Sequence, residues 1–278
     1  MEHTRASLAP VRQITAAAVV ACGLAAPAAG AEVGRVRIGE AEIAFETLGR
    51  SGPVVVFESG RGEDMRSWDH VARPLAACAR VVLYDRPGIG RSSPRTGASV
   101  LLADTVVHQL AALLHAIDMP PLYILVGHSL GGFYAQAFAR KRPAEVAAVV
   151  LVDAASPFEP PGVFVSTVPP KPGSIEAAEE AGFAPSVRAM LAGPPFPAVP
   201  LIVLAATNHG DTPEREALWR ETQARTAALS PKGQLRIVDG SGHFIQTDRP
   251  QAVVDAVLEA LRQTGADVSA CKTTDPVR

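Results

Sequence analysis

The amino-acid sequence predicts an α/β protein in which helices cover both faces of a mostly parallel sheet. From Val33 onward, short apolar runs alternate with longer helical stretches. Most of these runs are apolar almost throughout, which is typical of strands buried on both faces. The 278 residues include 47% hydrophobic and 19% charged side chains, enough apolar material for one large core.

The strands are expected in a regular order along the chain. Polar and apolar residues alternate over residues 35–38 and 42–47 on either side of Gly39, which indicates a leading antiparallel hairpin. The apolar runs that follow predict buried strands at residues 54–57, 81–84, 123–126, 146–152, 201–205 and 235–238. Together they make an eight-stranded sheet.

Helices are expected between these strands, at residues 67–78, 100–117, 132–141, 213–229 and 250–263. Residues 154–200 break the alternation, because they contain eleven prolines and only weak helical patterns near residues 175–181 and 186–192. We interpret this insertion as a cap over the carboxyl ends of the strands, where open α/β sheets bind ligands. The alternative is a disordered surface segment, which would expose several phenylalanines.

The first 31 residues are typical of a secretory signal rather than of a fold. Basic side chains precede an apolar stretch from Ile14 to Ala26, and small residues follow up to Ala31. We therefore expect cleavage before Glu32 and a secreted or periplasmic protein of residues 32–278. A second interpretation is a lipoprotein signal in which Cys22 is acylated and holds the protein on the membrane.

Charge and cysteine content narrow the function classes. The formal net charge is −2 and no basic run occurs, so neither nucleic acid nor an anionic membrane is an expected partner. The three cysteines lack the close spacing of metal sites, and no metal or cofactor is expected. Once the signal is removed, Cys78 and Cys271 remain, and an oxidising compartment favours a disulfide between them over two buried thiols.

The motif with the clearest chemistry lies at residues 127–132, Gly-His-Ser-Leu-Gly-Gly, between a predicted strand and a predicted helix. Glycines at positions 127 and 131 permit a turn too sharp for side chains there, and this turn lifts the Ser129 hydroxyl out of the sheet. The helix that follows places backbone N–H groups near a developing oxyanion. Ser129 is therefore the candidate nucleophile, and a helix-capping serine is the alternative interpretation.

With this motif, residues 33–264 resemble the α/β-hydrolase superfamily, specifically bacterial serine esterases with a cap after the sixth strand. Three further motifs carry the resemblance, at residues 57–62 (Phe-Glu-Ser-Gly-Arg-Gly), 84–92 (Tyr-Asp-Arg-Pro-Gly-Ile-Gly-Arg-Ser) and 240–244 (Gly-Ser-Gly-His-Phe). The resemblance assigns a structural rather than a catalytic role to the turn at residues 85–88. Trp68, on the helix after the first of these motifs, is expected either in the core or in the pocket wall.

His243 is the candidate general base, because it follows the last predicted strand on a glycine-rich turn that can bring its ring over Ser129. His128 and His209 are weaker candidates for this role. The oxyanion hole is expected to combine the backbone N–H of Leu130 with that of Arg61, by resemblance to the family's His-Gly-x turn. Ser59 replaces the usual histidine there, so the surrounding hydrogen bonds are expected to differ.

Two aspartates compete as the acid that orients the base. Asp153 ends the strand predicted at residues 146–152, a place from which some relatives draw the acid. Asp211 follows the next strand, the commoner location, but it stands two residues before Pro213 and equally suits a helix start. The family's usual position corresponds to His209 in this chain. We favour Asp153 and keep Asp211 as the alternative.

These features predict an exported serine hydrolase that cleaves a carboxylic ester or similar acyl bond through an acyl-enzyme. Phe158, Phe164 and Phe196 in the cap favour a small or medium, largely apolar substrate. The resemblance also leaves open a cofactor-free haloperoxidase, a lactonase or an amidase on the same triad. A different class is a binding protein that kept the fold and lost catalysis.

Overall fold

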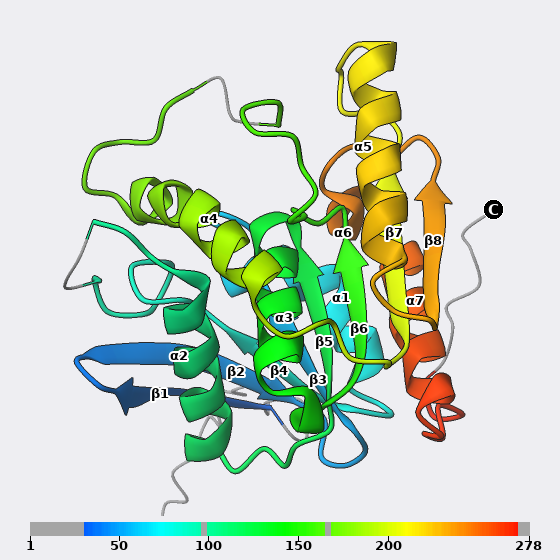
Figure 1. The fold of residues 1–278 in the computed structure, drawn as a ribbon. Coiled ribbons are helices and arrows are strands. Elements are labelled where there is room, and N and C mark those ends of the chain that lie inside the picture. The colour runs from blue at the N-terminus through cyan, green and yellow to red at the C-terminus, as the bar shows by residue number, and fades with distance from the viewer. Residues whose placement is uncertain (1–30, 96–98, 165–167, 272–278) are drawn as a thin grey trace, which may run out of the picture.

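The computed structural model describes residues 31–95, 99–164 and 168–271 (Figure 1). The predicted signal peptide, with Cys22, lies outside the described residues except for Ala31. Within the described ranges, no helix is both long enough and apolar enough to cross a membrane.

One eight-stranded sheet forms the centre of the fold, in the order β1-β2-β4-β3-β5-β6-β7-β8. Strand β2 runs antiparallel to both its neighbours, and the strands from β4 to β8 are parallel to one another. The predicted fold class is therefore confirmed. The strands are β1 (Glu32–Ile38), β2 (Ala41–Leu48), β3 (Val54–Glu58), β4 (Arg80–Tyr84), β5 (Tyr123–His128), β6 (Val146–Val152), β7 (Leu201–Ala206) and β8 (Gly233–Val238).

Helices bury both faces of this sheet, as the continuous apolar strands require. Along β5, Tyr123 and Leu125 pack with one helical layer, whereas Ile124 and Val126 pack with the other. The first layer contains α2 (Ala103–Ala116), α3 (Ser129–Lys141) and α4 (Ile175–Ala192), and the second contains α1 (Asp69–Leu75) and α7 (Pro250–Gln263). The remaining helical elements are η1 (Met65–Trp68), η2 (Pro143–Glu145), α5 (Pro213–Ala227) and α6 (Ile245–Asp248).

The insertion at residues 154–200 contains one long helix, α4, where the sequence shows only two weak patterns. Ser174 caps its start by accepting a hydrogen bond from the Ala177 N–H, and the helix continues through Pro185. Gly182 permits close docking, since a Cβ there would lie 1.8 Å from the Leu101 carbonyl oxygen. Tertiary packing therefore outweighs the local cost of a proline inside the helix.

The docking of α4 also explains why α2 begins later than the sequence predicts. The sequence predicts a helix from residue 100, but the N–H of Leu101 donates to the carbonyl of Ala178 in α4, at 2.8 Å. The N–H of Ala103 then donates to Ser186 Oγ, at 2.9 Å. Helix α2 consequently begins at Ala103, where its first N–H group finds a partner on α4.

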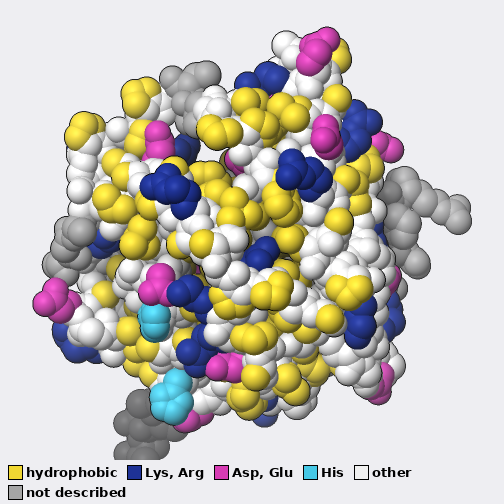
Figure 2. Space-filling model, in the orientation of Figure 1, with side chains coloured by type: hydrophobic (Ala, Val, Ile, Leu, Met, Phe, Trp, Pro, Cys, Tyr) yellow, Lys and Arg dark blue, Asp and Glu magenta, His cyan; other side chains and the backbone are white. Residues whose placement is uncertain are grey.

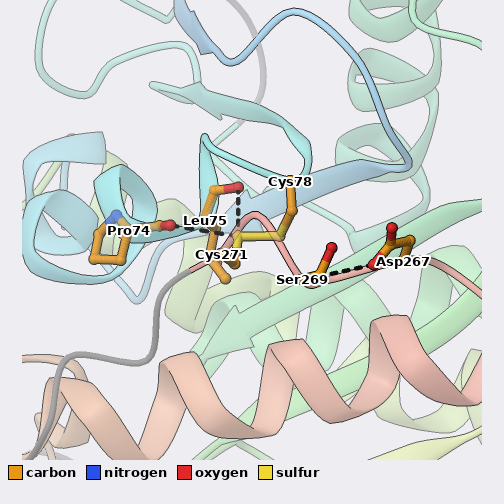
Figure 3. The surroundings of a disulfide bond; sticks show 6 residues. All are labelled: Pro74, Leu75, Cys78, Asp267, Ser269 and Cys271. Atoms are coloured by element: carbon orange, nitrogen blue, oxygen red, sulfur yellow. Dashed lines mark hydrogen bonds between the residues drawn. A yellow bond between two sulfur atoms is a disulfide. The ribbon is translucent and has the colours of Figure 1, made fainter.

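A disulfide joins Cys78, just after α1, to Cys271, beyond α7 (Figure 3). The two cysteines are 193 residues apart in sequence, and their Cα atoms lie 5.2 Å apart. The bond therefore closes most of the chain into one covalent loop and ties the segment after α7 to the end of α1.

Candidate active site

Ser129 occupies the sharp turn from β5 into α3, with a φ of +50°. A Cβ at Gly127 would lie 2.6 Å from Gly132 Cα, and a Cβ at Gly131 would lie 2.2 Å from the Glu58 carbonyl oxygen. Side chains at positions 127 and 131 would clash with backbone, as the sequence predicts. The left-handed conformation of Ser129 is the strained backbone that raises its hydroxyl above the carboxyl end of β5.

His243 lies in the loop between β8 and α6, and its Nε2 is 3.0 Å from Ser129 Oγ. Its Nδ1 is 2.7 Å from Asp153 Oδ2. An ionised carboxylate only accepts hydrogen bonds, so Nδ1 carries the proton and Nε2 is left to accept the serine proton. This is the tautomer that a general base needs.

Asp153 follows β6 and is completely buried, with a φ of +43°. Its Oδ1 accepts hydrogen bonds from the Ala206 N–H at 2.9 Å and from Trp219 Nε1 at 2.8 Å. Its Oδ2 faces both His243 Nδ1 and His209 Nε2, each at 2.7 Å. Burial acts to raise the pKa of Asp153, but the bonds and charges of His209 and His243 outweigh it and hold the pKa below its usual value.

Asp211, the alternative acid, lies elsewhere. It is exposed, and its Oδ1 accepts a hydrogen bond from Arg215 Nε at 2.8 Å, one turn along α5. Thr212 caps α5, and Pro213 takes its first position. The structure therefore assigns this segment to a helix start, one of the two interpretations that the sequence leaves open, and places Asp153 rather than Asp211 against His243.

The turn after β3 lies directly beneath the start of α3. The carbonyl oxygens of Glu58 and Ser59 would both contact a Cβ at Gly131, which shows how closely the two segments approach. Among the described residues, the Arg61 N–H has no hydrogen-bond partner, and the Leu130 N–H belongs to the unsatisfied first turn of α3. Two free donors therefore lie on adjoining segments near Ser129.

Comparisons with known proteins relate the chain to the α/β hydrolases. A family model for the alpha/beta hydrolase fold matches residues 53–176. The uncharacterised protein YqjL of Bacillus subtilis is 26% identical over 215 residues, which cover 76% of this chain and 84% of YqjL. A putative carbamate hydrolase RutD of Variovorax paradoxus is 37% identical over 104 residues, which cover 37% of this chain and 38% of RutD.

A solved structure of a thermophilic esterase from Thermogutta terrifontis has a TM-score of 0.63 at 23% identity, covering 84% of this chain and 99% of the esterase chain. The fold, and the sequence of the matched segment at residues 53–176, are those of the α/β-hydrolase superfamily. These matches support a hydrolase activity of the α/β-hydrolase type.

Other residues hold the turn after β3 in place. Ser59 stands where the resemblance implies a histidine, and its Oγ accepts a hydrogen bond from Trp68 Nε1 at 3.1 Å. Trp68 is fully buried, so it belongs to the core rather than to a pocket wall. Asp85 anchors its own turn by accepting from the Met65 and Arg91 N–H groups, at 2.8 and 2.7 Å, the structural role that the resemblance assigns.

Arg86 is a buried cation that sequence reasoning did not single out. It donates to the carbonyl oxygens of Ser59 and Gly60, at 2.7 and 2.6 Å, and so holds the turn after β3. It also pairs with Glu58 at 2.7 Å and with Glu179 of α4 at 2.8 Å. Because Glu179 belongs to α4, this ion network connects that helix of the insertion to the candidate oxyanion turn.

His128, beside the nucleophile, is fully buried and supports the base through the backbone. Its Nε2 donates to the carbonyl oxygen of His243 at 2.9 Å, and its Nδ1 lies 3.1 Å from Glu63 Oε2. Burial acts to raise the pKa of Glu63, but the hydrogen bond and charge of His128 outweigh it, so the Glu63 pKa is lowered. His128 therefore has a packing and positioning role, and its Nε2 does not face Ser129.

The three cap phenylalanines lie in different surroundings. Phe158 and Phe164 are half-buried beneath arginines of α5, and Phe164 also packs on Trp219 with ring centroids 4.9 Å apart. Phe196 is buried in the core. It therefore does not line an apolar pocket, although the sequence predicts that it would. On the face shown in Figure 2, the surface is hollowed near α4, and hydrophobic side chains border the hollow.

Proposed function

We propose that the protein is an exported serine hydrolase that cleaves a carboxylic ester or similar acyl bond through an acyl-enzyme on Ser129. The observation that carries the proposal is the continuous contact from Ser129 Oγ to His243 Nε2, and from His243 Nδ1 to Asp153 Oδ2. A serine hydroxyl becomes an effective nucleophile when a correctly oriented base accepts its proton.

In the first half of the reaction, Ser129 Oγ attacks the acyl carbon while its proton passes to His243 Nε2. The bond to the leaving alcohol then breaks, and His243 gives that proton to the departing oxygen. In the second half, water loses a proton to His243 and attacks the acyl-enzyme, which releases the acid and restores the Ser129 hydroxyl. Asp153 stabilises the imidazolium that forms in both halves.

The negative charge on the acyl oxygen needs two donors, and we assign these to the backbone N–H groups of Leu130 and Arg61. Their positions at the start of α3 and in the adjoining turn support this role. Each such donor contributes roughly 2.7–4 kcal/mol to lowering the barrier in enzymes of this kind. The Arg61 side chain is not needed for it, since Arg61 Nη1 pairs with Glu180 at 2.7 Å.

We infer an apolar acyl or alcohol group of small to medium size. Phe164 supports this inference, because it packs on the tryptophan that donates to Asp153 and so brings aromatic surface near the triad acid. Export is inferred from the sequence of residues 1–31, and the Cys78–Cys271 bond is consistent with an oxidising compartment.

The deciding experiment is hydrolysis of p-nitrophenyl esters from acetate to decanoate by the exported protein. We expect turnover with a preference for one chain length, and Ser129→Ala is expected to remove it while leaving the circular dichroism spectrum unchanged. Labelling by a fluorophosphonate, read by intact mass, checks whether the same serine is reactive without relying on the choice of ester.

Turnover that persists above a few per cent in Ser129→Ala contradicts the proposed nucleophile. Serine-dependent labelling without ester turnover points instead to a lactonase, an amidase or a cofactor-free haloperoxidase on the same residues. A folded protein that neither turns over esters nor takes up the label is better explained as a binding protein.

A further inference from the structure

His209 lies in the loop after β7, with only 14% of its side chain exposed, and both its ring nitrogens face carboxylates. Nε2 is 2.7 Å from Asp153 Oδ2, and Nδ1 is 2.8 Å from Glu216 Oε2. The backbone N–H of His209 also donates to Glu216 Oε1 at 2.8 Å, which fixes the loop to α5. The ring is thus held between two acids, one of them the candidate triad acid.

Ionised carboxylates offer only acceptors, so a ring with both nitrogens on carboxylates carries two protons and a positive charge. Burial acts to lower the pKa of His209, but the hydrogen bonds and charges of Asp153 and Glu216 outweigh it and raise the pKa to about 9. The imidazolium form is therefore kept through neutral pH and lost as the pH rises through about 9.

His209 and His243 share one oxygen atom, Asp153 Oδ2, and their ring centroids lie 6.2 Å apart. We propose that His209 is a positioning residue whose fixed positive charge, held by Glu216, offsets the charge of Asp153 and thereby sets the pH range over which His243 acts as the base. This inference rests on the proposed serine-hydrolase function. It extends the triad to a chain of five groups that ends at Glu216.

The same three groups, Asp153, His209 and His243, are side-chain types that also bind zinc. Ligand atoms about 2.0–2.2 Å from a tetrahedral zinc lie roughly 3.4 Å from one another. Here both nitrogens are 2.7 Å from Oδ2, which is the spacing of charge-assisted hydrogen bonds with protons between the atoms. The geometry therefore favours proton-mediated contacts over a metal centre.

The charged surroundings of His209 are predominantly acidic. Asp153 and Glu216 contact the ring directly, and the His243 ring centroid lies 6.2 Å away. His243 itself also faces His128, at 4.7 Å between ring centroids, and His128 contacts Glu63. The charged or titratable groups farther out are Glu159, whose pKa burial raises to about 7, and the ion pair of Arg215 with Asp211 on α5. Of these groups, only His209 brings a positive charge into direct contact with Asp153 while His243 is neutral.

Removing this charge has a predictable direction. In His209→Gln the ring charge disappears, so Asp153 stabilises a protonated His243 more strongly, and His243 gives up its proton only at higher pH. For charges 6.2 Å apart and an effective dielectric constant of about 20 to 80, the acidic midpoint of the kcat/KM profile is expected to rise by about 0.5 to 2 pH units.

Glu216→Gln tests the charge while keeping the histidine. A glutamine amide can donate to His209 Nδ1, so the ring can stay neutral and still donate from Nε2 to Asp153. We expect a smaller midpoint shift in the same direction. Glu214→Gln makes the same chemical change two residues away at an exposed position of α5, and it is expected to leave the midpoint unchanged.

A purely structural His209 would lower kcat or the melting temperature without moving the midpoint, so an unmoved midpoint in folded His209→Gln overturns the inference. A second measurement, an NMR titration of the His209 ring, does not depend on turnover. The ring signals are assigned by their disappearance in His209→Gln. We expect a midpoint near 9 that falls in Glu216→Gln. A wild-type midpoint below 7 overturns the inference, whereas absent turnover with a midpoint near 9 counts against the proposed function alone.

Discussion

Replacing Asp153 by asparagine is the most informative single change in the site, because the side-chain shape is kept while the acceptor pattern changes. The amide oxygen can still accept from the Ala206 N–H and from Trp219 Nε1, which now bond Oδ1. The amide nitrogen must then face His243 Nδ1, where Oδ2 accepts a hydrogen bond in the native protein. A donor at that point forces the His243 proton onto Nε2, the wrong tautomer for a base that faces Ser129.

The size of the effect follows from this reversal. The wrong tautomer disables the base, and the imidazolium that forms during the reaction loses its charge-assisted hydrogen bond. An equivalent asparagine substitution in serine proteases lowers kcat by about 10⁴. We therefore expect a loss of about 10³ to 10⁴ in kcat, or about 4 to 5.5 kcal/mol of barrier height.

Asp211→Asn is the matched control, since it makes the same chemical change at the other candidate acid. Asp211 is exposed and paired with Arg215, and such surface pairs contribute about 0–1 kcal/mol to stability. We expect unchanged kcat. The assay is ester hydrolysis at pH 8, with circular dichroism melts to show that both variants fold. An Asp153→Asn enzyme that keeps more than a tenth of wild-type kcat, or an equal loss in both variants, would refute the reasoning.

Two further predictions concern stability. Cys78→Ser should lower the free energy of unfolding by about 2–5 kcal/mol, because the bond closes a loop of 193 residues in the unfolded chain; equal denaturant midpoints for wild type and variant would count against this. Glu179→Gln should lower the free energy of unfolding by about 3 kcal/mol, because the charge of Arg86 is then partly uncompensated in the core. It should also lower kcat/KM, because the turn after β3 loosens. Its neighbour Glu180→Gln breaks only the exposed pair with Arg61 and should change the melting temperature little; similar effects of the two variants would show that burial of the ion pair does not matter.

The nucleophile turn illustrates what short-range pattern predicts well. An apolar strand, two glycines that leave no room for side chains and a following helix are all local features of residues 123–141. The same holds for the buried strands, because a continuous apolar run means burial on both faces wherever the strand lies in the sheet. Helix α4 is the opposite case, since its stability depends on docking through Gly182 onto the segment before α2.

Local sequence pattern was enough to predict the α/β architecture, the position of Ser129 in its turn and two candidate aspartates for the acid. The choice between the two aspartates required the folded structure, because it depends on which carboxylate lies against His243. The folded structure also placed His209 against Asp153, and Arg86 between the turn after β3 and helix α4 of the insertion. These contacts join residues 27 to 93 positions apart. Their contribution to stability depends on burial, which removes competing water and makes a charged partner necessary. Distance and burial of this kind have no local signature in the sequence.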